Sequence, residues 1–168
     1  MVNFKRWLRH LFTPPKAWRR AFPQATLDAI ETAIHAGETR DGGEIRFAIE
    51  NNLPAILVWR GMSGRERAIE MFSNLRVWDT EHNSGVLIYL LLTDHDIEIV
   101  ADRGIAAQVD PAAWEAVAQT MEAAFRQGEF ERGGLAGIQQ ISVLLAAHFP
   151  PSGHNPDELA NRPVILGR

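Results

Sequence analysis

The sequence predicts an α/β protein, a three-layer α/β/α sandwich that is Rossmann-like, with a small mixed sheet and helices on both of its faces. Three observations predict this fold. The continuously apolar run Val86–Leu92 is typical of a strand that is covered on both faces. A second, mostly β-branched run, Ile97–Ala101, follows after a short polar link, which indicates a β-hairpin. Helical patterns precede, separate and follow the strands, so both faces of the sheet have helices to cover them.

A basic amphipathic helix is expected at the start of the chain, before Pro14-Pro15. Its apolar residues recur at helical spacing, and they are Phe4, Trp7, Leu8, Leu11 and Phe12. Two interpretations remain open for this helix. It docks on the membrane surface or on a membrane-protein partner, or it packs against its own domain with solvated arginines. A helix of this length is marginal unless its apolar face is buried somewhere.

The next segments alternate between helix and strand. A helix is expected from Pro23, a suitable first-turn residue, and it ends before a turn at Gly42-Gly43. The alternating pattern of Glu44–Glu50 predicts a strand, and Pro54–Trp59 either extends the sheet or covers it. Ser63 is a good N-cap for a helix that continues to about Leu75.

Two more helices are expected after the hairpin. Asp110-Pro111 combines an acceptor side chain with proline at the first helical position, and Gly128 follows the end of that helix. The last helix carries Gly134, Ile138 and Leu145 at helical spacing, and it stops before the prolines that follow. The chain is therefore divided into a basic helix (1–20), the α/β/α domain (21–149) and an extended proline-rich tail (150–168) whose end docks.

Composition excludes several classes of function. The chain has 168 residues, 46% of them apolar, which is enough for one domain with a real core. It has no cysteine, which excludes disulfides, thiolate zinc sites and cysteine nucleophiles. No apolar run has the length of a membrane span, and charges interrupt any signal-peptide core, so we expect a cytoplasmic protein, peripheral to the inner membrane if the first helix docks there. Residues 1–20 contain six basic residues and no acid, whereas the remaining body is strongly acidic, which argues against a nucleic-acid partner.

The hairpin divides its acids between two ends of the sheet. Folding it about Asp94–His95 brings the loop Asp79–Gly85 beside Asp102-Arg103-Gly104, and it leaves Asp94 and Asp96 in a solvated turn at the other end. Asp79, Asn83 and Asp102 are hard oxygen donors of the kind that calcium and magnesium prefer. The sequence therefore predicts a divalent-cation site at this sheet end. The alternative is structural, with Asp79 and Asn83 in turns and Asp102 paired with Arg103 on the surface.

Several short motifs in this order resemble those of the TPM domain family, over roughly residues 24–148. They are Gly43-Glu44-Ile45, Val77-Trp78-Asp79, Asn83-Ser84-Gly85-Val86-Leu87-Ile88, Asp94 to Gly104, Asp110, and Gly128-Glu129-Phe130-Glu131-Arg132-Gly133. The chain departs from the family's pattern at Ser84 and at Asp102-Arg103-Gly104. The resemblance implies the Rossmann-like α/β/α fold, and the family includes proposed phosphatases and calcium-binding members. Bacterial members often accompany LemA-type membrane proteins.

Two functions follow from these observations. In the first, the cation polarises a phosphoryl oxygen and Arg103 holds the phosphate, so Asp79, Asp102 and Arg103 are the candidate catalytic residues of a phosphatase. In the second, the chain is a non-enzymatic interaction module that docks at the inner face of the membrane through its basic helix, with LemA-type partners.

Overall fold

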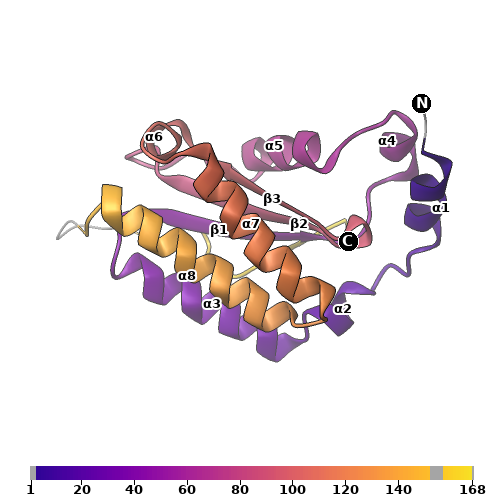
Figure 1. Cartoon of the computed structure of the whole chain (residues 1–168), viewed down its shortest axis with the longest axis horizontal. Coiled ribbons are helices and arrows are strands. Elements are labelled where there is room, and N and C mark those ends of the chain that lie inside the picture. The colour runs from indigo at the N-terminus through magenta and orange to yellow at the C-terminus, as the bar shows by residue number, and fades with distance from the viewer. Residues whose placement is uncertain (1–2, 152–156, 168) are drawn as a thin grey trace.

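The computed structural model describes residues 3–151 and 157–167 and has a four-stranded sheet between two layers of helices (Figure 1). The strands are β1 (Glu44–Glu50), β2 (Gly85–Leu91), β3 (Asp96–Ala101) and β4 (Val164–Leu166), in the order β3-β2-β1-β4. One face is covered by α3 (Gln24–Glu38), α7 (Pro111–Arg126) and α8 (Phe130–His148). The other is covered by α5 (Gly64–Asn74), with α1 (Phe4–Phe12) and α4 (Ala55–Trp59) beside it. Three short elements complete the described chain: α2 (Trp18–Ala21), the 3₁₀ turn η1 (Leu92–Asp94) and α6 (Arg103–Ala106). The predicted α/β/α sandwich is confirmed.

The sheet is mixed. β1 runs parallel to both β2 and β4, whereas β2 and β3 form the predicted antiparallel hairpin. Val86 lies opposite Ala101, slightly closer to the turn than the expected position at residues 102–103. The end of the tail, expected to be extended, adds β4 to the edge of the sheet next to β1.

β2 is buried on both faces because its side chains enter two different cores. Val86, Ile88 and Leu90 belong to the core beneath α3, α7 and α8. Leu87, Tyr89 and Leu91 belong to the core beneath α5. Alternate residues of a strand point to opposite faces, so a strand buried on both sides must be apolar throughout, as the sequence of β2 is.

The predicted helix caps are present. The Ser63 side chain accepts a hydrogen bond from the Glu66 N–H while the Glu66 carboxylate accepts one from the Ser63 N–H, which is a full capping box. Asp110 caps α7 by accepting from the Ala112 N–H. Gly128 has a φ of 77°, which glycine adopts at little cost, and it separates α7 from α8.

Of the two alternatives for Pro54–Trp59, the structure shows the second: Ala55–Trp59 forms the short helix α4, which packs on one face of the sheet and adds no strand. The five apolar residues after the proline suit either conformation. One segment differs from the expected local structure. The turn at Asp94 is not solvated: the Asp94 side chain is only 10% exposed and pairs with residues of α1. Within the described ranges, no helix is long and apolar enough to cross a membrane.

Candidate functional site

Three acidic side chains from distant parts of the chain meet at the end of the sheet where β1 begins. Glu38 ends α3, Glu44 opens β1, and Asp157 lies on the tail that leads to β4. One ligand atom from each lies within 4.8 Å of the others, and no other group of three or more such side chains converges in this way in the described part of the chain. We call these three residues the tail cluster.

Hydrogen bonds from the tail hold the two inner carboxylates. The Glu44 oxygens accept from the backbone N–H groups of Glu158 at 3.3 Å and Leu159 at 3.2 Å. The Asn161 side-chain amide donates to Glu38 at 2.8 Å. Glu44 is 1% exposed and Glu38 8%, so two carboxylates are almost removed from water beneath the tail.

The pKa values of both carboxyls are raised. Burial, together with the nearby charge of Glu44, raises the pKa of Glu38 to about 8. Burial is also the main cause that raises the pKa of Glu44 to about 7, against the lowering effect of the hydrogen bonds from the tail N–H groups and with a further contribution from the charge of Asp157. Deprotonating the cluster therefore costs free energy, and a divalent cation would supply the positive charge that lowers this cost.

Further oxygen atoms lie next to the tail cluster. The Asn161 side-chain oxygen is buried and has no hydrogen-bond partner among the described residues, while the nitrogen of the same amide contacts Glu38. A hollow of about 470 Å³ borders the cluster and is lined by Glu31, Thr32, His35, Asp157 and Asn161. A set of carboxylate and amide oxygens suits calcium in particular, because calcium accepts more oxygens and looser geometry than magnesium.

The residues predicted to form the site lie at the same sheet end, but only some of them meet. Arg103 donates from Nε to the Asn83 side-chain oxygen at 3.2 Å, and the Arg103 N–H donates to Asp102 Oδ1 at 2.7 Å, so these three lie together. Asp79 instead forms an ion pair with Arg76 at 3.2 Å. Asp79 also lines a separate hollow of about 300 Å³ with Arg46 and Glu158.

Asn83 and Asp102 have clear structural roles. Asp102 is the N-cap of α6, and its own N–H donates to the Gly85 carbonyl at 2.8 Å. Asn83 has a φ of 50° in the turn before β2, a conformation that asparagine tolerates better than most residues. Its carbonyl accepts from the Ile105 N–H at 3.3 Å, which ties this turn to α6.

Sequence reasoning did not identify the tail cluster. In the sequence, Glu38 belongs to the end of a predicted helix, Glu44 is the first residue of a predicted strand, and Asp157 lies in a polar tail. The local signal is Glu44, a charged residue at the entry of a strand in which polar and apolar residues alternate. Its burial depends on the tail, which local patterns do not place.

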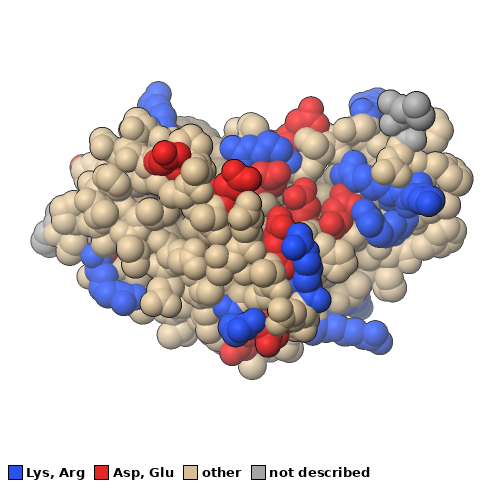
Figure 2. All heavy atoms as spheres, in the orientation of Figure 1, with Lys and Arg blue, Asp and Glu red and all other residues tan. Residues whose placement is uncertain are grey.

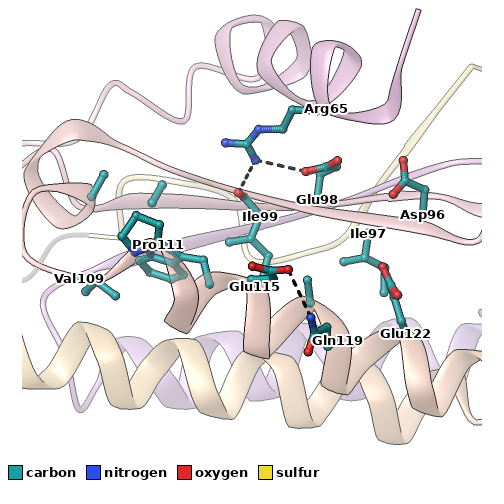
Figure 3. Close-up of a pocket in the computed structure, with 14 residues that line it drawn as sticks. Arg65, Asp96, Ile97, Glu98, Ile99, Val109, Pro111, Glu115, Gln119 and Glu122 are labelled. Carbon is teal, nitrogen blue, oxygen red and sulfur yellow. Dashed lines mark hydrogen bonds and ion pairs between the residues drawn. The ribbon is translucent and has the colours of Figure 1, made fainter.

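A larger groove follows β3 at the open edge of the sheet, between α5 and α7 (Figure 3). Its volume is about 600 Å³, and its acidic lining residues are Asp96, Glu98, Glu115 and Glu122. Burial raises the pKa of Asp96 and of Glu98, and each is raised further by a neighbouring carboxylate. Arg65 spans the groove by donating to the Ile99 carbonyl at 2.7 Å and to Glu98 at 3.3 Å. No three acids converge here within the described residues, so the tail cluster remains the candidate site.

Comparison with known proteins identifies one family whose model matches this chain. A family model described as the TPM domain matches residues 19–144. The matched range includes α3, the hairpin and most of α8, and it excludes α1 and β4. No curated protein matches the chain.

Solved structures with the same fold accompany this match. The NMR structure of the BA42 protein from the psychrophilic bacterium Bizionia argentinensis is 30% identical, with a TM-score of 0.74, covering 84% of this chain and 92% of that one. The solution NMR structure of the N-terminal domain of a P. gingivalis protein has a TM-score of 0.61 at 14% identity, covering 78% of this chain and 82% of that one. The second likeness concerns the fold alone.

Proposed function

This chain belongs to the TPM domain family, and from that premise we propose that it is a domain that binds a divalent cation at the tail cluster. The observation that supports the proposal is the convergence of Glu38, Glu44 and Asp157 within 4.8 Å, with two of the three almost buried. Calcium is the expected ion, and magnesium should bind more weakly, because the cluster combines carboxylate and amide oxygens and calcium accepts more such ligands in looser geometry.

The bound cation would act as a structural link. Its ligands come from the end of α3, the start of β1 and the tail, so binding would fix the part of the tail that leads to β4 against the start of β1. Occupancy would then depend on the calcium concentration, and the order of the tail would follow it. This gives the domain a way to change the surface that its last residues present.

Calcium is expected to raise the melting temperature of the protein. A hundredfold excess over the dissociation constant should add about 2.7 kcal/mol to the free energy of unfolding. Glu38→Gln and Asp157→Asn should each remove most of this gain, because each removes a charged ligand. The measurement is thermal unfolding with calcium, magnesium or chelator, together with calorimetric titration.

The residues predicted from the hairpin supply the matched controls. Asp79→Asn and Asp102→Asn also remove one carboxylate each at the same sheet end, but they should leave the calcium effect unchanged. If these variants lose the effect while Glu38→Gln keeps it, the cation lies at the hairpin residues and the proposal is wrong. If no divalent ion stabilises the wild-type protein, the domain has no such function.

Phosphatase activity is a second, more specific proposal, and the family resemblance supports it. Arg103 lies at the sheet end that also contains the tail cluster, held by Asn83, and a guanidinium is suited to hold a phosphate. Turnover of a phosphomonoester such as p-nitrophenyl phosphate is expected to need the cation and to fall at least about tenfold in Arg103→Met. Hydrolysis that continues unchanged in Arg103→Met, Asp79→Asn and Asp102→Asn would assign it to a contaminant.

A further inference from the structure

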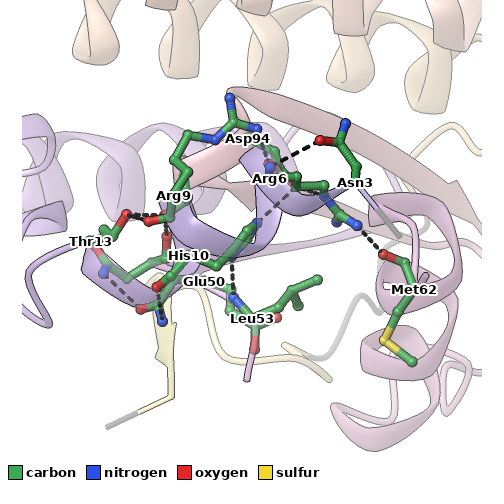
Figure 4. A network of polar contacts seen from close by, with 12 residues as sticks. Asn3, Arg6, Arg9, His10, Thr13, Glu50, Leu53, Met62 and Asp94 are labelled. Carbon is green, nitrogen blue, oxygen red and sulfur yellow. Dashed lines mark hydrogen bonds and ion pairs between the residues drawn. The ribbon is translucent and has the colours of Figure 1, made fainter. Parts of the chain in front are cut away.

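The first helix, α1, is attached to the domain through its polar face. Arg6 and Arg9 both form ion pairs with Asp94, at 2.8 Å and 2.5 Å (Figure 4). His10 is buried between them, with Nε2 lying 3.1 Å from the same carboxylate. The Leu53 N–H donates to His10 Nδ1 at 3.0 Å, so Nδ1 acts as an acceptor while Nε2 faces Asp94.

Asp94 is the anchor of this attachment. Burial alone would raise its pKa, but the hydrogen bonds from His10 and Arg6 hold the pKa of this carboxyl well below its ordinary value. Arg6 also donates to the Met62 carbonyl at 2.7 Å, which joins α1 to the segment before α5. The helix is therefore fixed in one orientation by contacts to three other parts of the chain, at Leu53, Met62 and Asp94.

As a result, the apolar face of α1 is turned toward solvent. One face of the helix carries four apolar side chains, spaced four, seven and eight residues from the first of them: Phe4, Leu8, Leu11 and Phe12. Phe4 is 59% exposed and Phe12 74%. An ordinary surface helix has the opposite arrangement, with its apolar face buried and its charges in water.

The short helix α4 extends this apolar surface. The Trp7 ring stacks on Phe4 with centroids 5.8 Å apart and meets the Trp59 ring edge-on at 6.1 Å. Ile56 and Trp59 are one helical turn apart, and both are exposed. The five exposed residues Phe4, Leu11, Phe12, Ile56 and Trp59 form what we call the α1–α4 platform. Among the described residues, only three large apolar side chains outside it are comparably exposed, so the apolar surface is concentrated here.

The charge around the platform is positive. Lys5 on α1 and Arg60 at the end of α4 are exposed, and residues 1–20 contain no acid. Figure 2 shows Lys and Arg side chains gathered at the end of the molecule that carries α1, whereas Asp and Glu line the middle of that face. α1 lies outside residues 19–144, which the family model matches, whereas α4 lies inside them, so the family model describes only the α4 part of this surface.

We propose that the α1–α4 platform docks on an anionic lipid surface. Phenylalanine, leucine and isoleucine side chains would enter the boundary between headgroups and acyl chains, and Trp59 would lie at the headgroup level. Lys5 and Arg60 would contact the lipid phosphates, while the acidic groove along β3 stays away from the bilayer. A positively charged apolar surface fits this ligand better than a second copy of the same platform, because two such copies would bring like charges together.

The test is flotation of the full chain with vesicles of phosphatidylcholine, with or without phosphatidylglycerol, in the presence of chelator. We expect binding to the anionic vesicles, weaker binding to neutral ones, and a blue shift of tryptophan fluorescence. The double variant Phe4→Ser/Phe12→Ser should lose binding by about tenfold or more, because it removes two of the inserted side chains. Both positions are exposed, so the variant should keep the melting temperature of the wild type.

Two tryptophans give a matched comparison. Trp59→Ser should weaken vesicle binding, whereas Trp78→Ser should not, although Trp78 is 47% exposed and Trp59 52%. Equal effects of the two variants, or no binding by the wild type, would overturn the proposal. A dimer in sedimentation that Phe4→Ser/Phe12→Ser dissociates would overturn it in favour of a second copy. Vesicle binding that requires calcium would also overturn the proposal. Vesicle binding by Glu38→Gln at the wild-type level would support it, even if this variant no longer binds calcium.

Discussion

In the presence of chelator, raising the pH from about 5 to about 9 is expected to lower the free energy of unfolding by on the order of 6 kcal/mol. The pKa of Glu38 is raised to about 8 and that of Glu44 to about 7, both from an ordinary value of 4.5, chiefly by burial. Between these limits the folded protein holds protons that the unfolded chain does not. The stability is therefore fully present below about pH 4.5 and is lost as the pH rises through 7 and 8.

Calcium should remove most of this loss, because a bound cation stabilises the deprotonated carboxylates. Its affinity should accordingly increase with pH up to about 8, and binding should release protons. Urea unfolding at stepwise pH, with calcium or with chelator, measures both effects. Glu38→Gln should give a flatter profile in chelator, while Asp79→Asn should follow the wild type. A stability that stays constant or rises across this range would show that the carboxyls of the tail cluster are not perturbed.

Arg67→Met is expected to destabilise the protein by about 3 kcal/mol. Arg67 on α5 donates from Nε and Nη2 to the two oxygens of Glu50, at 2.9 Å and 2.7 Å. Tyr89 donates to the same carboxylate, and Glu50 is only 1% exposed. Methionine fills much of the same volume, so the loss comes from leaving a charged carboxylate buried without its cation.

A surface ion pair provides the control for this variant. Arg126→Met breaks an i,i+4 pair with Glu122 on α7, where the arginine is largely exposed, and it should cost no more than about 0.5 kcal/mol. Adding Glu50→Gln to Arg67→Met should recover part of the stability, because it removes the stranded charge. Urea unfolding measures these losses. A loss of free energy of unfolding in Arg67→Met as small as that in Arg126→Met would mean that water reaches Glu50.

The elements that could be predicted are those whose signal is local. The apolar run of β2, the caps at Ser63 and Asp110, and the hairpin from β2 to β3 each depend on neighbouring residues. The same hairpin geometry brought Asn83 beside Asp102 and Arg103. The short helix α4 could not be told from a strand, because a run of five apolar residues has no distinguishing period.

The candidate site could not be predicted, because it forms only when the tail has been placed. Glu38 and Glu44 are separated from Asp157 by more than a hundred positions, and their meeting depends on the pairing of β4 with β1. Asp94 is a similar case. Its sequence neighbours indicate a solvated turn, but its partners Arg6 and Arg9 lie on α1, 88 and 85 positions earlier in the chain.

The strand β1 separates the two proposed binding surfaces. Glu44 opens it at the tail cluster, and Asn51, just after its last residue, accepts from the Trp18 N–H near the helices at the N-terminal end. Seven residues of strand place these ends roughly 20 Å apart, and β1 is paired with β2 along its whole length, independently of the tail. Calcium is proposed to order the tail and not the β1–β2 pair, so the coupling free energy between calcium and lipid should be close to zero. The domain would then report two independent conditions, the calcium concentration and the presence of a membrane, from opposite ends of one strand.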